Sequence, residues 1–207
     1  QKIIRNKIRK VFFSIKDPDI RSSNKSLKKF KKSNIGVNVG IFSKKINEFY
    51  KSYILFKKDE LPFVTCKLAV SKDLFTINKK KNWITNVYSR ARVHLMRSNH
   101  DTIMTSSKTI ITDNPFLNCR INGLEKRSPS RILLDNYLKI STSSNVIKDS
   151  YKYKTIVFYN KDNKKKIKIL KKLGIKIYKI PVNSNGDLDL KKTLIKAKQL
   201  GSSRIFL

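Results

Sequence analysis

Four polar side chains follow or interrupt apolar segments, and their types suit the binding of a polar ligand. Lys67 interrupts an apolar run, Thr109 and Asp113 belong to one polar segment, and Arg120 follows that segment. In a parallel sheet, ligands bind outside the carboxyl ends of the strands, where such side chains gather. We therefore treat these four as candidate ligand-binding residues. For Lys67, a cation placed against a substrate and a lysine that is paired or extends to solvent stay equally open.

The common nucleotide-binding and hydrolase motifs are absent from the sequence. The sequence contains none of the motifs G-x-x-x-x-G-K-S/T, G-x-G-x-x-G, G-x-S-x-G and H-E-x-x-H. It has only 6 glycines, which are too few for a glycine-rich phosphate loop. Cys66 and Cys119 lie far apart without a C-x-x-C pair, so neither a disulfide framework nor a zinc site is indicated. We expect both to be reduced core thiols in a cytoplasmic protein.

A strong excess of positive charge extends along the whole chain. The 207 residues include 48 Lys+Arg and 14 Asp+Glu, which gives a formal charge of +34. Such a charge is typical of nucleic-acid-binding proteins, because lysine and arginine neutralise phosphates. An AT-rich genome gives the same charge to any enzyme, because its codons favour lysine, isoleucine and asparagine. The chain has this composition, with 38 Lys against 10 Arg, 26 Ile, 18 Asn and 3 Ala. Because the basic residues are dispersed, we favour this second explanation and expect no nucleic-acid partner.

Apolar runs that alternate with helical patterns indicate an α/β protein with a mostly parallel central sheet and helices on both faces. Strands are predicted at Lys10–Ile15, Ile35–Val39, Phe63–Val70, Asp101–Thr105, Arg131–Asp135, Thr155–Tyr159, Ile175–Tyr178 and Arg204–Leu207. Helices are predicted at 25–32, from Ser43, at 85–97, at 162–173 and at 189–200, with Ser43, Thr85 and Asp189 as N-caps. No run approaches the roughly 18 apolar residues of a membrane span.

A domain boundary is predicted near residue 58. The segment that ends at Pro62 is charged, and proline disfavours helix at the residue before it. We therefore expect residues 1–58 and 59–207 to form separate units.

Several segments resemble one enzyme family. They are Pro62–Asp73 (PFVTCKLAVSKD), Trp83–Thr85 (WIT), Arg90–Arg97 (RARVHLMR), Asp101–Arg120 (DTIMTSSKTIITDNPFLNCR) and Pro129–Asp135 (PSRILLD). These segments are similar to the reductase half of the bifunctional riboflavin-biosynthesis deaminase/reductase family. The resemblance covers nearly the whole chain, because Ile15–Asp19 (IKDPD) is similar to the closing part of that family's deaminase domain.

This resemblance implies a dihydrofolate-reductase-like fold, preceded by a small β-α-β-α remnant of a cytidine-deaminase-like domain. It also implies that NADPH reduces the ribosylamino group of a phosphorylated pyrimidine to ribitylamino, in a protein that we expect to be a homo-oligomer. The enzyme must then hold the nicotinamide against the sugar C1, bind the phosphate and assist a protonation. Lys67, a cation in an otherwise apolar run, is our candidate catalytic residue.

The resemblance also assigns residues to the two ligands. The substrate positions of the family match Arg97, Leu117 and Arg120, and two guanidinium forks suit the bidentate contacts of a phosphate. The positions that contact NADPH in the family match Ala69, Trp83, Thr109, Asp113 and Asn136. Neither His94 nor His100 matches a position with an assigned role.

The chain departs from the family pattern at three places. Lys81 stands where the family has a substrate-binding serine, which leaves it a weak candidate. An acidic substrate residue and a glycine-rich turn for the cofactor phosphates are expected directly after Leu207, where the sequence ends. The H-x-E and P-C-x-x-C zinc motif of the deaminase is absent. We therefore expect a segment cut at both ends, with zinc only in the missing deaminase part and no deamination from these residues.

Two alternatives to this reductase stay open. The charge of +34 fits a basic RNA-binding or ribosomal protein, which would bind RNA in a salt-dependent way and show no specific affinity for NADPH. A related reductase of the same fold that acts on another pterin or pyrimidine is a third candidate, because a fold does not fix a substrate.

Overall fold

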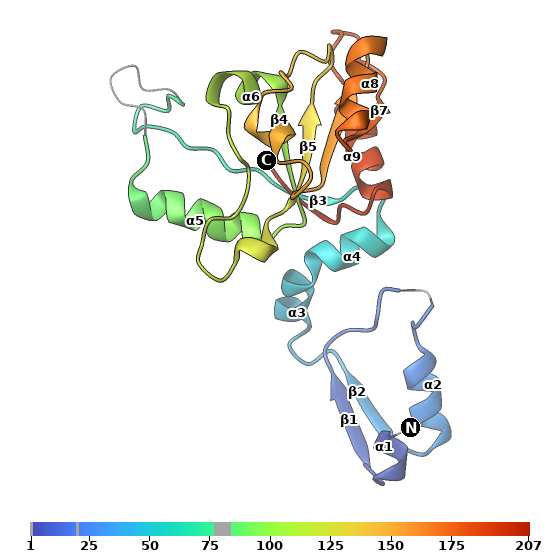
Figure 1. Ribbon diagram of the computed structural model, residues 1–207. Coiled ribbons are helices and arrows are strands. Elements are labelled where there is room, and N and C mark those ends of the chain that lie inside the picture. Colours follow the sequence, from blue (N-terminus) through green and yellow to red (C-terminus); the bar gives the residue numbers. More distant parts are fainter. Residues whose placement is uncertain (1, 20, 77–83) are drawn as a thin grey trace. The chain divides into compact units, whose positions relative to one another are not determined.

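A computed structural model of the chain describes residues 2–19, 21–76 and 84–207 (Figure 1). The chain divides into two compact units, Gln1–Phe63 and Val64–Leu207. In the described ranges, no helix is long and apolar enough to cross a membrane.

The first unit is a small parallel two-stranded sheet with short helices. Its elements are α1 (Lys2–Arg5), β1 (Lys10–Phe13), α2 (Lys25–Lys32), β2 (Gly36–Val39), α3 (Ser43–Phe49) and α4 (Lys51–Lys58). Strands β1 and β2 pair in parallel, with Lys10 opposite Gly36. The predicted order of strand, helix, strand and helix is confirmed. The Asp17 carboxylate accepts the Asp19 backbone N–H at 2.9 Å, which builds the predicted turn after β1.

The second unit is built on a six-stranded sheet in the order β3-β8-β4-β5-β6-β7. Its strands are β3 (Phe63–Thr65), β4 (Thr102–Ser106), β5 (Ser130–Leu134), β6 (Thr155–Tyr159), β7 (Lys176–Lys179) and β8 (Arg204–Phe206). The pairs from β8 through β4, β5 and β6 to β7 are all parallel, so their carboxyl ends lie at one edge. Its helices are α5 (Val87–Ser98), α6 (Ser107–Asp113), η1 (Glu125–Arg127), α7 (Asn145–Lys148), α8 (Lys164–Lys172) and α9 (Leu190–Gln199).

Two apolar layers enclose the sheet, and successive residues of one strand alternate between them. In β6, Val157 packs with residues of α6, α7 and α8 on one face, while Ile156 and Phe158 pack with residues of α9 on the other. Every residue of β6 is therefore buried, which is why its sequence is nearly all apolar. The predicted parallel sheet with helices on both faces is confirmed.

Helix α9 shows how local sequence signals fix an element. The Asp189 side chain accepts the Lys192 backbone N–H at 3.0 Å, as the predicted N-cap requires. Gly201 follows the helix with φ +99°, a conformation that only glycine adopts without strain. Both predicted ends of this helix are confirmed.

Several local predictions were wrong. Strand β3 ends at Thr65, so Lys67 lies beyond the strand and not within it. The helix predicted to start at Thr85 is capped by Asn86, whose side chain accepts the Ser89 N–H at 2.9 Å. Cys66 is exposed and not a core thiol, whereas Cys119 is buried as expected.

Two further helical features differ from the prediction. The polar segment that carries Thr109 and Asp113 forms helix α6, because the Ser106 hydroxyl caps the N-terminus of this helix. Ser43 begins α3 but does not cap it; the N-cap position is held by Phe42, which has φ +54° and makes no side-chain cap bond.

Candidate functional site

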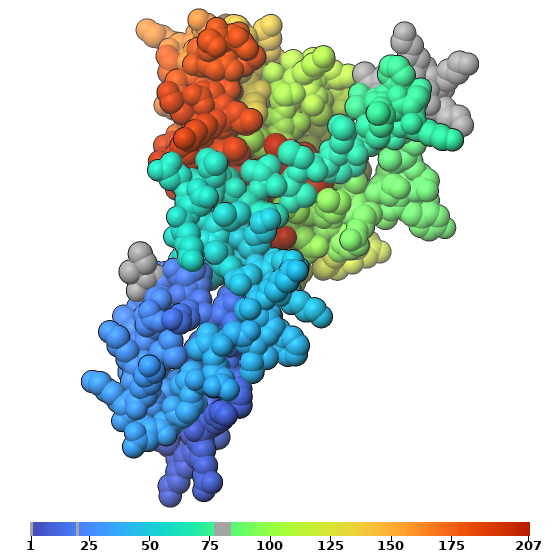
Figure 2. Space-filling model, turned by 180° about the vertical axis from the view of Figure 1, so that it is seen from behind, coloured from blue at the N-terminus to red at the C-terminus, as the bar shows by residue number. Residues whose placement is uncertain are grey.

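The segment that follows β3 places two candidate residues on one side of the chain. The Lys67 backbone N–H donates to the Leu207 carbonyl at 3.0 Å, which ties this segment to β8. Lys67 and Ala69 are half-buried, whereas Leu68 between them is 75% exposed. This alternation is that of an extended chain, so Lys67 and Ala69 face the same way. Figure 2 shows the segment in cyan to teal, crossing the surface of the second unit.

Helix α6 begins at the carboxyl end of β4 and positions Thr109. The Thr109 backbone N–H lies 3.4 Å from the Ser106 hydroxyl, which accepts it at the helix N-terminus. Thr109 is half-buried in the first turn, while Asp113 is exposed at the end of the helix. The two residues are four positions apart and therefore lie one turn apart on the same face of the helix, with Thr109 nearer the sheet edge.

The loop after β5 holds Asn136 with one of its polar atoms unused. The buried Asp135 carboxylate accepts the backbone N–H groups of Lys139 and Ile140, both at 2.8 Å, and this fixes the turn. The Asn136 Nδ2 donates to the Gly186 carbonyl at 2.8 Å. Its Oδ1 is buried and has no hydrogen-bond partner among the described residues.

A second group gathers around the Asn118 carbonyl. Arg97 Nη1 donates to this oxygen at 3.1 Å, and His94 Nδ1 lies 3.2 Å from it. Arg120 Nη2 lies 3.4 Å from His94 Nε2. The Arg120 backbone N–H also donates to His94 Nδ1 at 3.2 Å, so Arg120 contacts the imidazole through both its backbone and its side chain. We call His94, Arg97, Asn118 and Arg120 the arginine cluster.

The arginine cluster carries unneutralised positive charge. Within the described ranges, neither Arg97 nor Arg120 forms an ion pair with a carboxylate, and Arg97 Nε is buried without a partner. Burial, and then the charge of Arg120, lower the pKa of Arg97. Burial also lowers the pKa of His94, as do Arg97 and Arg120. Two adjacent cations with spare donors are the environment that a phosphate group requires.

Leu117 lies beside this cluster in an unusual conformation. Its φ is +56°, in the left-handed region, and its side chain is 6% exposed within the apolar layer that also includes Ile110 and Leu133. A leucine rarely adopts this backbone conformation, so neighbouring contacts must hold it there.

The structure brings Arg97, Leu117 and Arg120 together, but it separates them from the residues that follow the strand ends. Helix α5 ends just before β4, so Arg97 lies near the amino end of that strand, whereas Thr109 and Asn136 follow carboxyl ends. Among the described residues, no hydrogen bond or ion pair joins the two groups. Arg120 therefore does not lie at a strand end, as the sequence had led us to expect; it lies on the chain that returns from α6 toward β5.

Two sequence-predicted residues cannot be placed. Lys81 and Trp83 lie outside the described residues.

Two members of the arginine cluster were not predicted. His94 is three residues before Arg97 on α5, a spacing that puts both on one helix face and that the sequence already contained. Asn118 acts through its backbone carbonyl, for which the sequence carries no signal.

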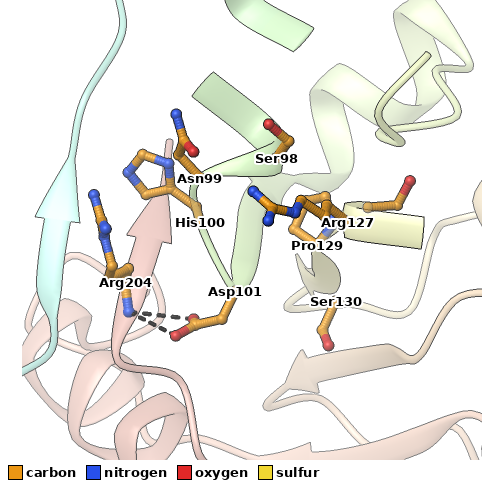
Figure 3. Close-up of a pocket in the computed structure, with 9 residues that line it drawn as sticks. Ser98, Asn99, His100, Asp101, Arg127, Pro129, Ser130 and Arg204 are labelled. Atoms are coloured by element: carbon orange, nitrogen blue, oxygen red, sulfur yellow. Dashed lines mark hydrogen bonds between the residues drawn. The ribbon is translucent and has the colours of Figure 1, made fainter. Parts of the chain in front are cut away.

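A separate cleft of about 500 Å³ opens at the amino ends of the strands (Figure 3). His100, Asp101, Arg127 and Arg204 are among the residues that line it. The Arg204 backbone N–H donates to the Asp101 carboxylate at 3.0 Å. This cleft lies at the sheet edge opposite to Thr109 and Asn136. In the part of the chain that the structure describes, no group of three or more acidic, histidine or cysteine side chains could hold a metal.

Comparisons with known proteins agree with the sequence resemblance. A protein-family model described as the RibD C-terminal domain matches residues 62–207. The riboflavin biosynthesis protein RibD of Aquifex aeolicus is 31% identical over 200 residues, which are 96% of this chain and 54% of the relative. Nothing in the comparisons favours an RNA-binding protein.

Two solved structures have the same fold. RibD from Acinetobacter baumannii superposes with a TM-score of 0.82 at 20% identity, over 99% of this chain and 56% of that one. The diaminohydroxyphosphoribosylaminopyrimidine deaminase/5-amino-6-(5-phosphoribosylamino)uracil reductase from Thermotoga maritima superposes with a TM-score of 0.79 at 22% identity, over 99% and 55%. The chain therefore spans about half the length of these proteins.

Proposed function

Because the chain belongs to the RibD C-terminal domain family, we propose that it carries the reductase of riboflavin biosynthesis. The reaction is the NADPH-dependent reduction of 5-amino-6-(5-phosphoribosylamino)uracil to the ribitylamino product. The observation that carries this proposal is the arginine cluster. Its two guanidinium groups have no carboxylate partner among the described residues and match the substrate positions of the family.

The substrate phosphate binds at the arginine cluster in this proposal. The guanidinium groups of Arg97 and Arg120 donate to its oxygens. The Asn118 carbonyl accepts a hydrogen bond from Arg97 Nη1, so that the Arg97 guanidinium is oriented before the ligand arrives. Leu117 packs beside this cluster and contributes an apolar wall.

The residues at the carboxyl edge fit a nicotinamide cofactor. Asn136 supplies a buried acceptor with no partner, Thr109 lies half-buried in the first turn of α6, and Ala69 leaves room for close approach to the backbone. Asp113 and Trp83 complete the set that the family resemblance assigns. When bound, NADPH supplies the hydride for the sugar C1.

Lys67 is the proposed proton donor. It is half-buried, and no carboxylate of the described residues forms an ion pair with it. Its ammonium group would hold a proton near the ring-opened imine nitrogen or the sugar oxygen. Lys81 stays a weaker candidate for a substrate contact.

We also propose that residues 1–58 are the closing part of a deaminase domain and that residues 59–207 are the reductase domain. The separation into two compact units at residue 63 and the family match from residue 62 support this division. Zinc would belong to the deaminase part outside this sequence.

The test is a steady-state assay of the full-length protein with the phosphoribosylamino pyrimidine and NADPH. The expected result is NADPH consumption that requires the pyrimidine, together with formation of the ribitylamino product. NADPH consumption with another pterin or pyrimidine but not with this substrate would contradict the substrate assignment. Salt-sensitive RNA binding without any NADPH affinity would contradict the enzyme assignment.

A further inference from the structure

Arg131 is a fully buried cation that joins four separate segments of the second unit. Arg131 is a residue of β5, and it is 0% exposed. Nη1 donates to the Asp149 carboxylate at 2.6 Å, Nε to the Thr155 hydroxyl at 3.1 Å, and Nη2 to the Tyr153 carbonyl at 3.2 Å. The guanidinium also lies 5.2 Å from the centre of the Tyr153 ring.

The fourth contact of Arg131 leads toward the arginine cluster. Nη1 also donates to the Phe116 carbonyl at 3.1 Å. Phe116 directly precedes Leu117, the residue with φ +56°. A hydrogen bond on the carbonyl before a left-handed leucine fixes the orientation of that peptide, and so holds the leucine in a conformation that it would otherwise leave.

The conformation of Leu117 in turn sets the direction of the next carbonyl. Asn118 follows, and its backbone oxygen is the acceptor that Arg97 and His94 share. Its side chain approaches Tyr153, with Nδ2 3.5 Å from the phenol oxygen, so the same network touches Asn118 twice. A continuous path of contacts therefore runs from Arg131 to the arginine cluster.

We propose that Arg131 is a positioning residue for the substrate-phosphate site, acting through the Phe116 carbonyl and the left-handed Leu117. This inference rests on the proposed function of the arginine cluster. A buried ion pair is by itself weak evidence for a role in stability, because apolar side chains of similar volume often serve as well. The planar guanidinium group of an arginine can donate to four acceptors from one position, whereas the ammonium group of a lysine cannot.

The test compares two variants of the full-length protein. Arg131→Lys keeps a charge for Asp149 but cannot also reach Phe116 and Tyr153. Asp149→Asn is the matched control, because it removes the carboxylate charge, leaves an acceptor for Nη1 and leaves the contact to Phe116. We expect Arg131→Lys to raise the KM for the phosphorylated substrate about tenfold or more, with kcat and the KM for NADPH within about twofold. Asp149→Asn should leave all three nearly unchanged.

A second measurement does not depend on activity. The His94 ring signal of the full-length protein is assigned by its absence from the spectrum of His94→Gln, and its NMR titration is then followed. Arg131→Lys should shift the His94 signal and its pKa, because the Asn118 carbonyl moves. His100, which contacts the Met96 carbonyl at 2.6 Å and the Thr65 hydroxyl at 2.8 Å, should not change.

The outcomes separate the inference from the proposed function. A shifted His94 in a protein without reductase activity would support the positioning role and contradict the function. A folded Arg131→Lys enzyme with unchanged KM and an unchanged His94 titration would overturn the positioning role. If Arg131→Lys does not fold, Arg131→Gln, whose neutral amide cannot reach all four acceptors, replaces it under the same expectations.

Discussion

Replacing Arg97 by methionine tests the assignment of the phosphate site. Methionine has a similar length and no charge, so it preserves much of the packing of α5 and removes every donor. The Asn118 carbonyl keeps His94 as a partner, which limits the damage to the fold. The main loss is the interaction of the guanidinium with the substrate phosphate.

The expected size of this loss follows from the contacts of Arg97. Nη1 donates to the Asn118 carbonyl, and no carboxylate of the described residues neutralises the guanidinium, so its charge is left for the ligand. A hydrogen bond to a charged group contributes about 1.5–3 kcal/mol. Since 1.4 kcal/mol corresponds to a factor of ten, the KM for the phosphorylated substrate should rise roughly 10- to 150-fold.

The assay is a set of initial rates with the substrate, its dephosphorylated analogue and NADPH. The KM for the dephosphorylated analogue and for NADPH should stay within about twofold of the parent values. Arg92→Met is the matched control, because Arg92 is exposed on the same helix. An Arg97→Met enzyme whose KM for the phosphorylated substrate is unchanged, or rises equally for both substrates, would refute the assignment.

Arg120→Met should raise the KM for the phosphorylated substrate less than Arg97→Met in the same rate assay, because Arg120 is exposed and solvent screens its charge. Asn136→Ala should weaken NADPH binding about tenfold in a fluorescence titration, because the buried free acceptor is lost; unchanged affinity would contradict its cofactor role. Phe158→Ala should lower the free energy of unfolding by about 3–5 kcal/mol in a denaturant titration, since Phe158 is 0% exposed. The pKa of His94 is lowered in the folded protein, so at a pH between the folded and the unfolded pKa the unfolded chain binds more protons than the folded chain. The free energy of unfolding should therefore decrease as the pH drops below about 6.5, the ordinary pKa of histidine, and become constant below the folded pKa. Inorganic phosphate should raise that pKa in an NMR titration, and an unchanged value would count against an anion at the cluster.

The sheet could be predicted from the sequence because burial on both faces leaves an almost continuous apolar run. Strand β6 shows this most clearly, since Ile156 and Val157 contact different layers and neither position admits a polar residue. Helix α9 could be predicted for a local reason, because Asp189 and Gly201 act within their own turn.

The site could be predicted only in part, because its geometry depends on contacts between distant residues. The family resemblance identified Arg97 and Arg120, but not that His94 and the Asn118 carbonyl lie between them, since these partners are 24 residues apart. The end of β3 before Lys67 could not be predicted either, because the run Phe63–Val70 carries one charged residue, that lysine, and is otherwise mostly apolar.

The central proposal is that the protein to which this chain belongs reduces a phosphoribosylamino pyrimidine with NADPH. The most direct measurement follows NADPH absorbance in the full-length protein with 5-amino-6-(5-phosphoribosylamino)uracil, and identifies the product. The account predicts one NADPH consumed for each ribitylamino product formed, at a rate that Arg97→Met lowers at limiting substrate. Absence of NADPH consumption by the folded full-length protein with this substrate would contradict it.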